Sequence, residues 1–158
     1  MKSLVVFDSQ FGNTQKIAHA VADQLALSGK AYAIHVDEVQ PGDLLGINLL
    51  VVGSPTQQFS ATSPIKHWLN IMPPAILNGV RAAAFDTRFT QEKIDEVKIL
   101  SFLVRIFGYG AEPIAKRLVK KGARLIAEPE GFFVADTEGP LLAEELARAA
   151  AWAEGLAS

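Results

Sequence analysis

The sequence contains no cysteine among its 158 residues. Disulfide bonds, thiol nucleophiles and thiolate metal sites are therefore excluded. The three histidines, His19, His35 and His67, show no metal-ligand or catalytic spacing with each other or with carboxylates. We therefore expect structural roles for them, no metal site, and no hydrolytic mechanism.

Excess charge and long apolar runs are also missing. The net charge of −2 and the pI of about 5.9 offer no basic footprint for nucleic acid. No apolar stretch approaches the ~18 residues of a membrane span, and the N-terminus lacks the basic region and cleavage site of a signal peptide. Apolar residues nevertheless make up 49% of the chain, which excludes disorder. We expect one cytoplasmic domain over residues 1–158.

Apolar runs and helical spacing alternate along the chain. Strands are expected at 4–7, 31–36, 48–53 and 80–85, with a fifth, interrupted strand at 123–127 and 132–135. Helices are expected from Asn13 and from Pro64, and a last helix has a narrow apolar face made of Leu142, Leu146, Ala149, Ala150 and Ala153. This alternation predicts an α/β fold, a doubly wound three-layer sandwich whose ligand lies at the carboxyl ends of the strands.

A loop with two hydroxyls and a glycine, Ser9 to Thr14, connects the first strand to the first helix. The first N–H groups of a helix lack internal partners and favour an anion, and the hydroxyls add donors. Gly12 would let the backbone approach closely. The loop contains no Lys or Arg, which argues against a Walker-type nucleotide site. The alternative is that Asn13 or Ser9 simply caps the helix.

Several motifs together resemble the flavodoxin family. Ser9-x-x-Gly12-Asn13-Thr14 resembles the FMN phosphate loop of flavodoxins, and Gly53-Ser54-Pro55-Thr56 is similar to their second cofactor loop. Phe85-Asp86-Thr87-Arg88 and Gly108-Tyr109-Gly110 are similar to the third cofactor loop of the family. Gly131-Phe132-Phe133-Val134 and Gly139-Pro140-Leu141 are similar to the closing part of its chains. The resemblance covers almost the whole chain. It implies a five-stranded parallel sheet in the order 2-1-3-4-5 and FMN as the cofactor.

The resemblance also implies which residues contact FMN. The phosphate would be held by Ser9, Gln10, Phe11, Gly12, Asn13 and Thr14, and one side of the ring would be lined by Ser54, Pro55, Thr56, Gln57, Gln58, Phe59 and Ser60. The pyrimidine edge and the remaining aromatic wall would come from Asp86, Thr87, Arg88, Phe89, Tyr109 and Gly110. Phe59 is the candidate for one ring face, and Tyr109 or Phe89 for the other. For each phenylalanine, ordinary core packing is the alternative. Arg88 would either stabilise negative charge on the reduced ring or form a surface ion pair with Asp86.

Two departures bear on function. No glycine lies between Ser54 and Ser63, where many flavodoxins carry one whose peptide flips when the ring is reduced. The small net charge also gives little electrostatic steering, whereas shuttle flavodoxins are usually strongly acidic. The first hypothesis is an FMN-binding protein that transfers electrons to a redox partner protein or a small quinone-like acceptor. The alternatives are an FMN-dependent NAD(P)H or quinone oxidoreductase and a cofactor-free interaction domain.

Two segments have no assigned role in that scheme. The insert at about 91–107 is very apolar in its second half, and it would pack on its own domain, cover the ring, form a homodimer contact or lie on a membrane surface. Lys116, Arg117, Lys120 and Lys121 form a basic cluster. That cluster is either a solvated helix face or a partner-docking patch.

Overall fold

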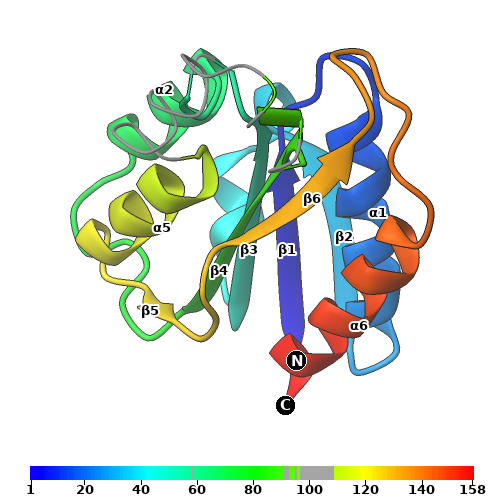
Figure 1. Cartoon of the computed structure of the whole chain (residues 1–158). Coiled ribbons are helices and arrows are strands. Elements are labelled where there is room, and N and C mark those ends of the chain that lie inside the picture. The colour runs from blue at the N-terminus through cyan, green and yellow to red at the C-terminus, as the bar shows by residue number, and fades with distance from the viewer. Residues whose placement is uncertain (58, 91–92, 95, 97–108) are drawn as a thin grey trace.

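A parallel sheet runs through the middle of the molecule, and helices cover both of its faces (Figure 1). The computed structural model describes residues 1–57, 59–90, 93–94, 96 and 109–158. The strands follow the order β2-β1-β3-β4-β5, and β6 also pairs with β4. The predicted order is thus confirmed, and the interrupted fifth strand is the pair β5 and β6. The bounds are β1 Lys2–Phe7, β2 Lys30–His35, β3 Leu49–Pro55, β4 Arg81–Phe89, β5 Arg124–Leu125 and β6 Glu130–Val134.

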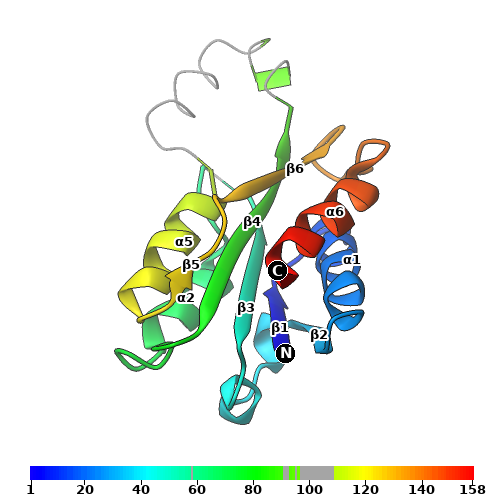
Figure 2. The ribbon, with the colours of Figure 1, turned by 90° about the horizontal axis from the view of Figure 1, so that it is seen from below.

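The helices form the two outer layers (Figure 2). Side chains of β3 alternate between two cores: Leu50 and Val52 face α2 and α5, whereas Leu49 and Val51 face α1 and α6. This two-sided burial explains the continuous apolar run of the strand. The helices are α1 Asn13–Ala26, α2 Ser63–Ile71, α5 Ala111–Lys120 and α6 Glu145–Ala157, with short 3-10 turns at η1 Val36–Glu38 and η2 Pro41–Leu44.

Strand β4 continues four residues beyond the predicted end at Phe85. The segment from Asp86 to Phe89, expected to be a loop, belongs to the strand because β6 pairs with it, from Phe85 opposite Glu130 to Phe89 opposite Val134. The predicted end of the fourth strand at Phe85 is therefore wrong. Sequence pattern could not show the extension, since polar residues in a strand look like a turn.

The apolar face of the last helix also differs from the prediction. α6 begins at Glu145, after Leu142, and Leu146 is 47% exposed. Ala149 and Ala153 are buried as expected, and Leu156 extends the buried stripe to the end of the helix. The helix start therefore shifts the buried face toward its C-terminal half.

The insert at 91–107 falls largely outside the described residues, and so do the interpretations given for it. None of the helices in the described ranges combines the length and the hydrophobicity that crossing a bilayer requires.

The centre of the sheet depends on a close contact between β3 and β4. Gly53 lies opposite Phe85 in the strand register, and the Phe85 ring occupies the space where a Cβ on Gly53 would be. Phe85 also makes edge-to-face contacts with Phe132 of β6 and Trp152 of α6, at 5.8 and 6.1 Å between ring centroids. The missing side chain at Gly53 therefore lets an aromatic cluster join α6 to the sheet.

We predict that Gly53→Ala destabilises the protein by about 1–3 kcal/mol, because the added methyl group overlaps the Phe85 ring. Chemical denaturation followed by tryptophan fluorescence measures this, since Trp152 belongs to the cluster. Gly42→Ala is the control: a Cβ there meets nothing within 4 Å, so its free energy of unfolding should be unchanged or slightly higher. Equal stability of both variants would contradict the proposed crowding.

Candidate functional site

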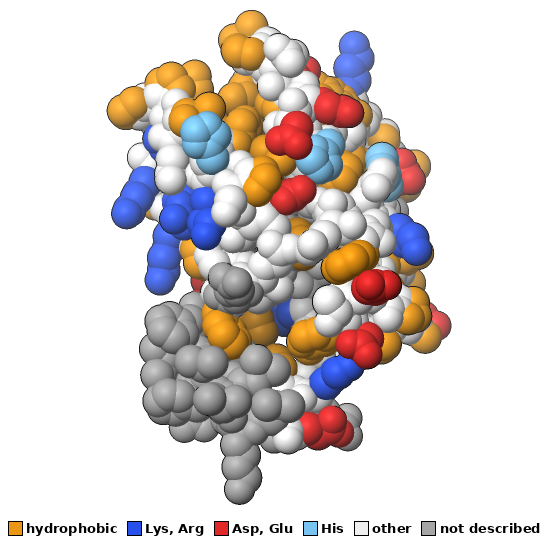
Figure 3. Space-filling model, turned by 90° about the horizontal axis from the view of Figure 1, so that it is seen from above, with side chains coloured by type: hydrophobic (Ala, Val, Ile, Leu, Met, Phe, Trp, Pro, Cys, Tyr) orange, Lys and Arg blue, Asp and Glu red, His pale blue; other side chains and the backbone are white. Residues whose placement is uncertain are grey.

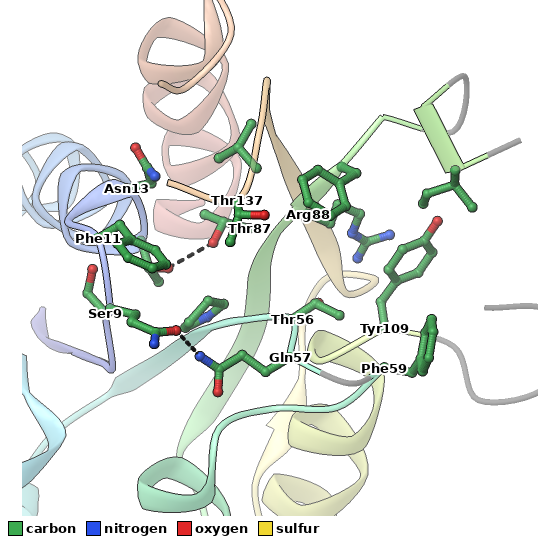
Figure 4. Close-up of a pocket in the computed structure, with 16 residues that line it drawn as sticks. Ser9, Phe11, Asn13, Thr56, Gln57, Phe59, Thr87, Arg88, Tyr109 and Thr137 are labelled. Carbon is green, nitrogen blue, oxygen red and sulfur yellow. Dashed lines mark hydrogen bonds between the residues drawn. The ribbon is translucent and has the colours of Figure 1, made fainter. Parts of the chain in front are cut away.

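A cavity of about 400 Å³ lies at the carboxyl ends of β1, β3 and β4 (Figure 4). Its polar end is next to the start of α1, and its aromatic end is next to the start of α5. Most of the predicted site residues line it. The lining residues are Ser9, Gln10, Phe11, Asn13, Thr14, Pro55, Thr56, Gln57, Phe59, Thr87, Arg88, Phe89, Ile94, Tyr109, Val134 and Thr137.

The polar end is organised by the hydroxyl of Ser9. Its Oγ accepts hydrogen bonds from the N–H of Gly12 at 3.1 Å and, more weakly, from that of Gln15 at 3.4 Å. With its lone pairs used in this way, the hydroxyl proton is left to donate to a ligand. The N–H groups of Asn13 and Thr14, in the first turn of α1, have no intrahelical partner by helix geometry. The N-cap position of α1 is Gly12 and not Asn13 or Ser9, and the Ser9 hydroxyl holds the loop in a shape that can bind an anion.

The loop needs Gly12 for its backbone conformation. Gly12 precedes the first residue of α1 and has φ of +88°, in the left-handed region. A Cβ there would meet no protein atom within 4 Å. The reason for glycine is therefore the positive φ, not crowding by the protein around it.

A second hydroxyl group at this end comes from a distant strand. Thr14 Oγ1 and Thr87 Oγ1 are 2.8 Å apart and both side chains are buried. One hydroxyl donates to the other, so the acceptor keeps its own proton for a ligand. The Nδ2 of Asn13 donates to the Glu138 carbonyl, which holds the loop carrying Thr137 against the cavity.

The second loop supplies the middle of the cavity. The N–H of Gln57 donates to the Ser60 carbonyl, and the N–H of Ser60 donates back, at 2.8 and 2.9 Å. This tight turn gives Phe59 a φ of +64°, which is rare for an aromatic residue. The loop therefore adopts a left-handed conformation without glycine. The Gln57 side chain also donates to Gln10 Oε1, joining the first and second loops across the cavity (Figure 4).

The aromatic end is built around Arg88. Its guanidinium carbon lies 3.7 Å from the centre of the Tyr109 ring, a cation–π contact. Phe59 lies beside Tyr109 (Figure 4), and Phe89 and Ile94 add apolar side chains to the lining of the cavity. Arg88 therefore covers one face of the Tyr109 ring.

Arg88 is held by a fully buried carboxylate, Asp86. Two hydrogen bonds join the two side chains, at 2.5 and 2.7 Å, and the Ala111 N–H donates to Asp86 Oδ2 at 2.9 Å. Burial raises the pKa of the Asp86 carboxyl, while the bonds from Arg88, from Ala111 and from the Thr56 hydroxyl oppose that rise. The surface ion pair expected for Arg88 is therefore a buried one, since only 16% of the Arg88 side chain is exposed.

A few predicted site residues do not line the cavity. Asp86 and Ser54 are completely buried behind it, and Gly110 donates its N–H to Thr56 Oγ1. Gly12 and Ser60 contribute backbone to the two loops, and Gln58 lies outside the described residues.

Sequence reasoning missed Ile94, Val134 and Thr137. Val134 belongs to a motif of the resemblance but was assigned to the fold, and Thr137 follows the same strand by three residues. The pairing of β6 with the extension of β4 brings both to the cavity, and no local pattern signals that pairing. Ile94 lies within the insert.

Comparison with known proteins points to one family. The family model described as flavodoxin matches residues 5–128. A flavodoxin from Aquifex aeolicus (strain VF5) is 31% identical in an alignment of 114 residues that covers 69% of this chain and 62% of that protein. The matched region thus spans less than two thirds of that relative's length.

Solved structures share the fold. A flavodoxin from the domain Archaea superposes with a TM-score of 0.75 at 18% identity, over 99% of this chain and 96% of that chain. Oxidised Flavodoxin 2 from Bacillus cereus gives a TM-score of 0.74 at 20% identity, over 99% and 98% of the two chains.

We predict that Arg88→Met destabilises the protein by about 3–5 kcal/mol, because it leaves the buried Asp86 carboxylate without its cation. The double variant Asp86→Asn/Arg88→Met should recover most of that loss, since a neutral amide still accepts the bond from the Ala111 N–H. Urea denaturation of both variants measures this. A double variant as unstable as the single one would show that the pair is not the cause.

Proposed function

Because the chain belongs to the flavodoxin family, whose members bind FMN and transfer electrons to redox partners, we propose that it holds FMN in this cavity and acts in electron transfer. The observation that carries the proposal is the division of the cavity into a polar end and an aromatic end. FMN has the same division, with a terminal phosphate and a flat ring.

The polar end fits a phosphate through uncharged donors. Ser9, the hydroxyl pair of Thr14 and Thr87, and the first N–H groups of α1 converge on it. Hydrogen bonds to a charged group contribute roughly 1.5–3 kcal/mol each, so several of them hold a phosphate without Lys or Arg. Arg88 is the only Lys or Arg among the described residues that line the cavity, and it lies at the aromatic end.

The aromatic end fits the ring. Phe59 and Tyr109 line this end with flat apolar side chains, and offset stacking adds roughly 0.5–1.5 kcal/mol beyond the area buried. Bound FMN would supply the reversible uptake of electrons, while these side chains orient the ring and exclude water. Arg88 places positive charge beside it, where charge develops on reduction.

An electron carrier is the function we favour. Several other expectations stay predictions from the sequence. They are the alternative function as an FMN-dependent NAD(P)H or quinone reductase, a quinone-like acceptor, a homodimer, a cytoplasmic location, and a single domain over residues 1–158 with its insert.

We predict that the purified protein is yellow, or becomes yellow with added FMN, and that dithionite bleaches its blue absorbance band while NADH and NADPH alone do not. A carrier lacks a nicotinamide site and receives its electrons from another protein. Bleaching by NADPH alone would assign the reductase function instead. Uptake of FMN is measured by the quenching of flavin fluorescence. A protein that takes up no FMN would refute the proposal.

We predict that Gly12→Val weakens FMN binding by at least about tenfold, because a branched residue at φ of +88° distorts the loop at a cost of roughly 1–3 kcal/mol. Gly46→Val is the matched control, since Gly46 also has a positive φ of +68° and open space around its Cβ but lies outside the cavity. Its stability should fall similarly while its affinity for FMN is kept. Equal affinity of the two variants would place the phosphate elsewhere.

A further inference from the structure

The outer face formed by α2 and α5 carries the opposite charge from the rest of the chain. Residues 63–71 and 111–121 contain five cationic side chains and one carboxylate, Glu112, although the whole chain has a net charge of −2. Figure 3 shows Lys and Arg side chains gathered on the side of the molecule where these helices lie. Four of the cations surround a hollow of about 520 Å³, here called the basic hollow, lined by Asn70, Pro74, Pro113, Lys116, Arg117, Lys120 and Lys121.

The fold uses two of these cations without neutralising them. Lys121 Nζ donates to the carbonyls of Asn70 and Met72, at 3.1 and 2.5 Å, which satisfies the C-terminal end of α2. Arg117 donates to Asn70 Oδ1 and to the Pro113 carbonyl. All these acceptors are uncharged, so α2 is joined to α5 while both positive charges remain uncompensated.

The remaining cations project into solvent. Lys116 and Lys120 are exposed, and no ion pair joins any of the four cations of the basic hollow to another residue in the described part of the chain. A purely structural role at the end of α5 would be met by one or two basic residues next to the helix dipole. Four uncompensated charges around one hollow exceed that need.

Apolar side chains accompany the charges. Val119 lies three residues after Lys116, on the same face of α5, and is 50% exposed. Ile71, next to Asn70 at the end of α2, is 63% exposed. Nucleic acid and lipid headgroups are bound mainly through charge, whereas protein interfaces combine apolar anchors with a charged rim. The mixture therefore favours a protein.

We infer that the basic hollow is a docking site for an acidic protein partner that presents apolar side chains between its carboxylates. The hollow extends along α5 from Pro113 in its first turn to Lys120 and Lys121 at its C-terminal end, where it meets the end of α2. That the partner is a redox protein rests on the proposed function. The charge preference is opposite to that of acidic flavodoxins, which dock on basic partners.

The probe is a fluorescent peptide of repeated Glu-Glu-Leu units, titrated by anisotropy at low and high salt. We predict that Lys116→Glu/Lys120→Glu weakens its binding by about tenfold or more at low salt, because each reversal replaces an attraction by a repulsion. The matched control Lys2→Glu/Lys30→Glu, on β1 and β2, changes the net charge equally and should alter binding by less than about twofold. Val119→Ser should weaken binding of this peptide but not of poly-L-glutamate, which lacks apolar side chains.

Equal loss in the two double variants would overturn the site, because binding would then follow net charge alone. Tighter binding of a DNA duplex or of phosphatidylserine vesicles than of the peptide at the same salt would also overturn it. The titration needs no flavin, so a protein that binds the peptide but takes up no added FMN would refute the FMN proposal and leave the docking site standing. A protein that takes up FMN but does not bind the peptide would refute the docking site and leave the FMN proposal standing.

Discussion

The cavity wall depends on how one buried carboxylate is compensated. Asp86 is fully buried in β4, and an ionised carboxylate in such a place needs several donors. Those donors come from its own strand, from the start of α5 and from the second loop. One charge thus fixes three segments relative to one another.

The position of the aromatic rings follows from the same charge. Arg88 must lie along β4 to reach Asp86, and the planar guanidinium then presents its face to Tyr109 at 3.7 Å. The guanidinium also fills the space above Gly131 of β6, where a Cβ would not fit. The buried contacts of Asp86 and Arg88 therefore fix the geometry of the aromatic end, so this geometry does not depend on a bound ligand.

The sequence predicted the parts of the site that are formed locally. The strand, loop and helix around Ser9 to Thr14 are contiguous, so hydroxyls, glycine and helical spacing could be read together. The hydroxyl pair of Thr14 and Thr87 joins residues 73 apart, and the bond from Asn13 to Glu138 spans 125. Such contacts exist only after the strand order is known. The extension of β4 was missed for the same reason, because its polar residues are buried by partners far along the chain.

The placement of charge separates the tasks of the two ends of the cavity. The polar end offers neutral donors, so it could stabilise an anion without attracting every anion in solution. The Arg88 guanidinium lies at the aromatic end, where Asp86 offsets much of its positive charge. The uncompensated cations lie outside, along α5. Because no carboxylate of the described residues pairs with them, these cations would steer an acidic partner toward the face formed by α2 and α5.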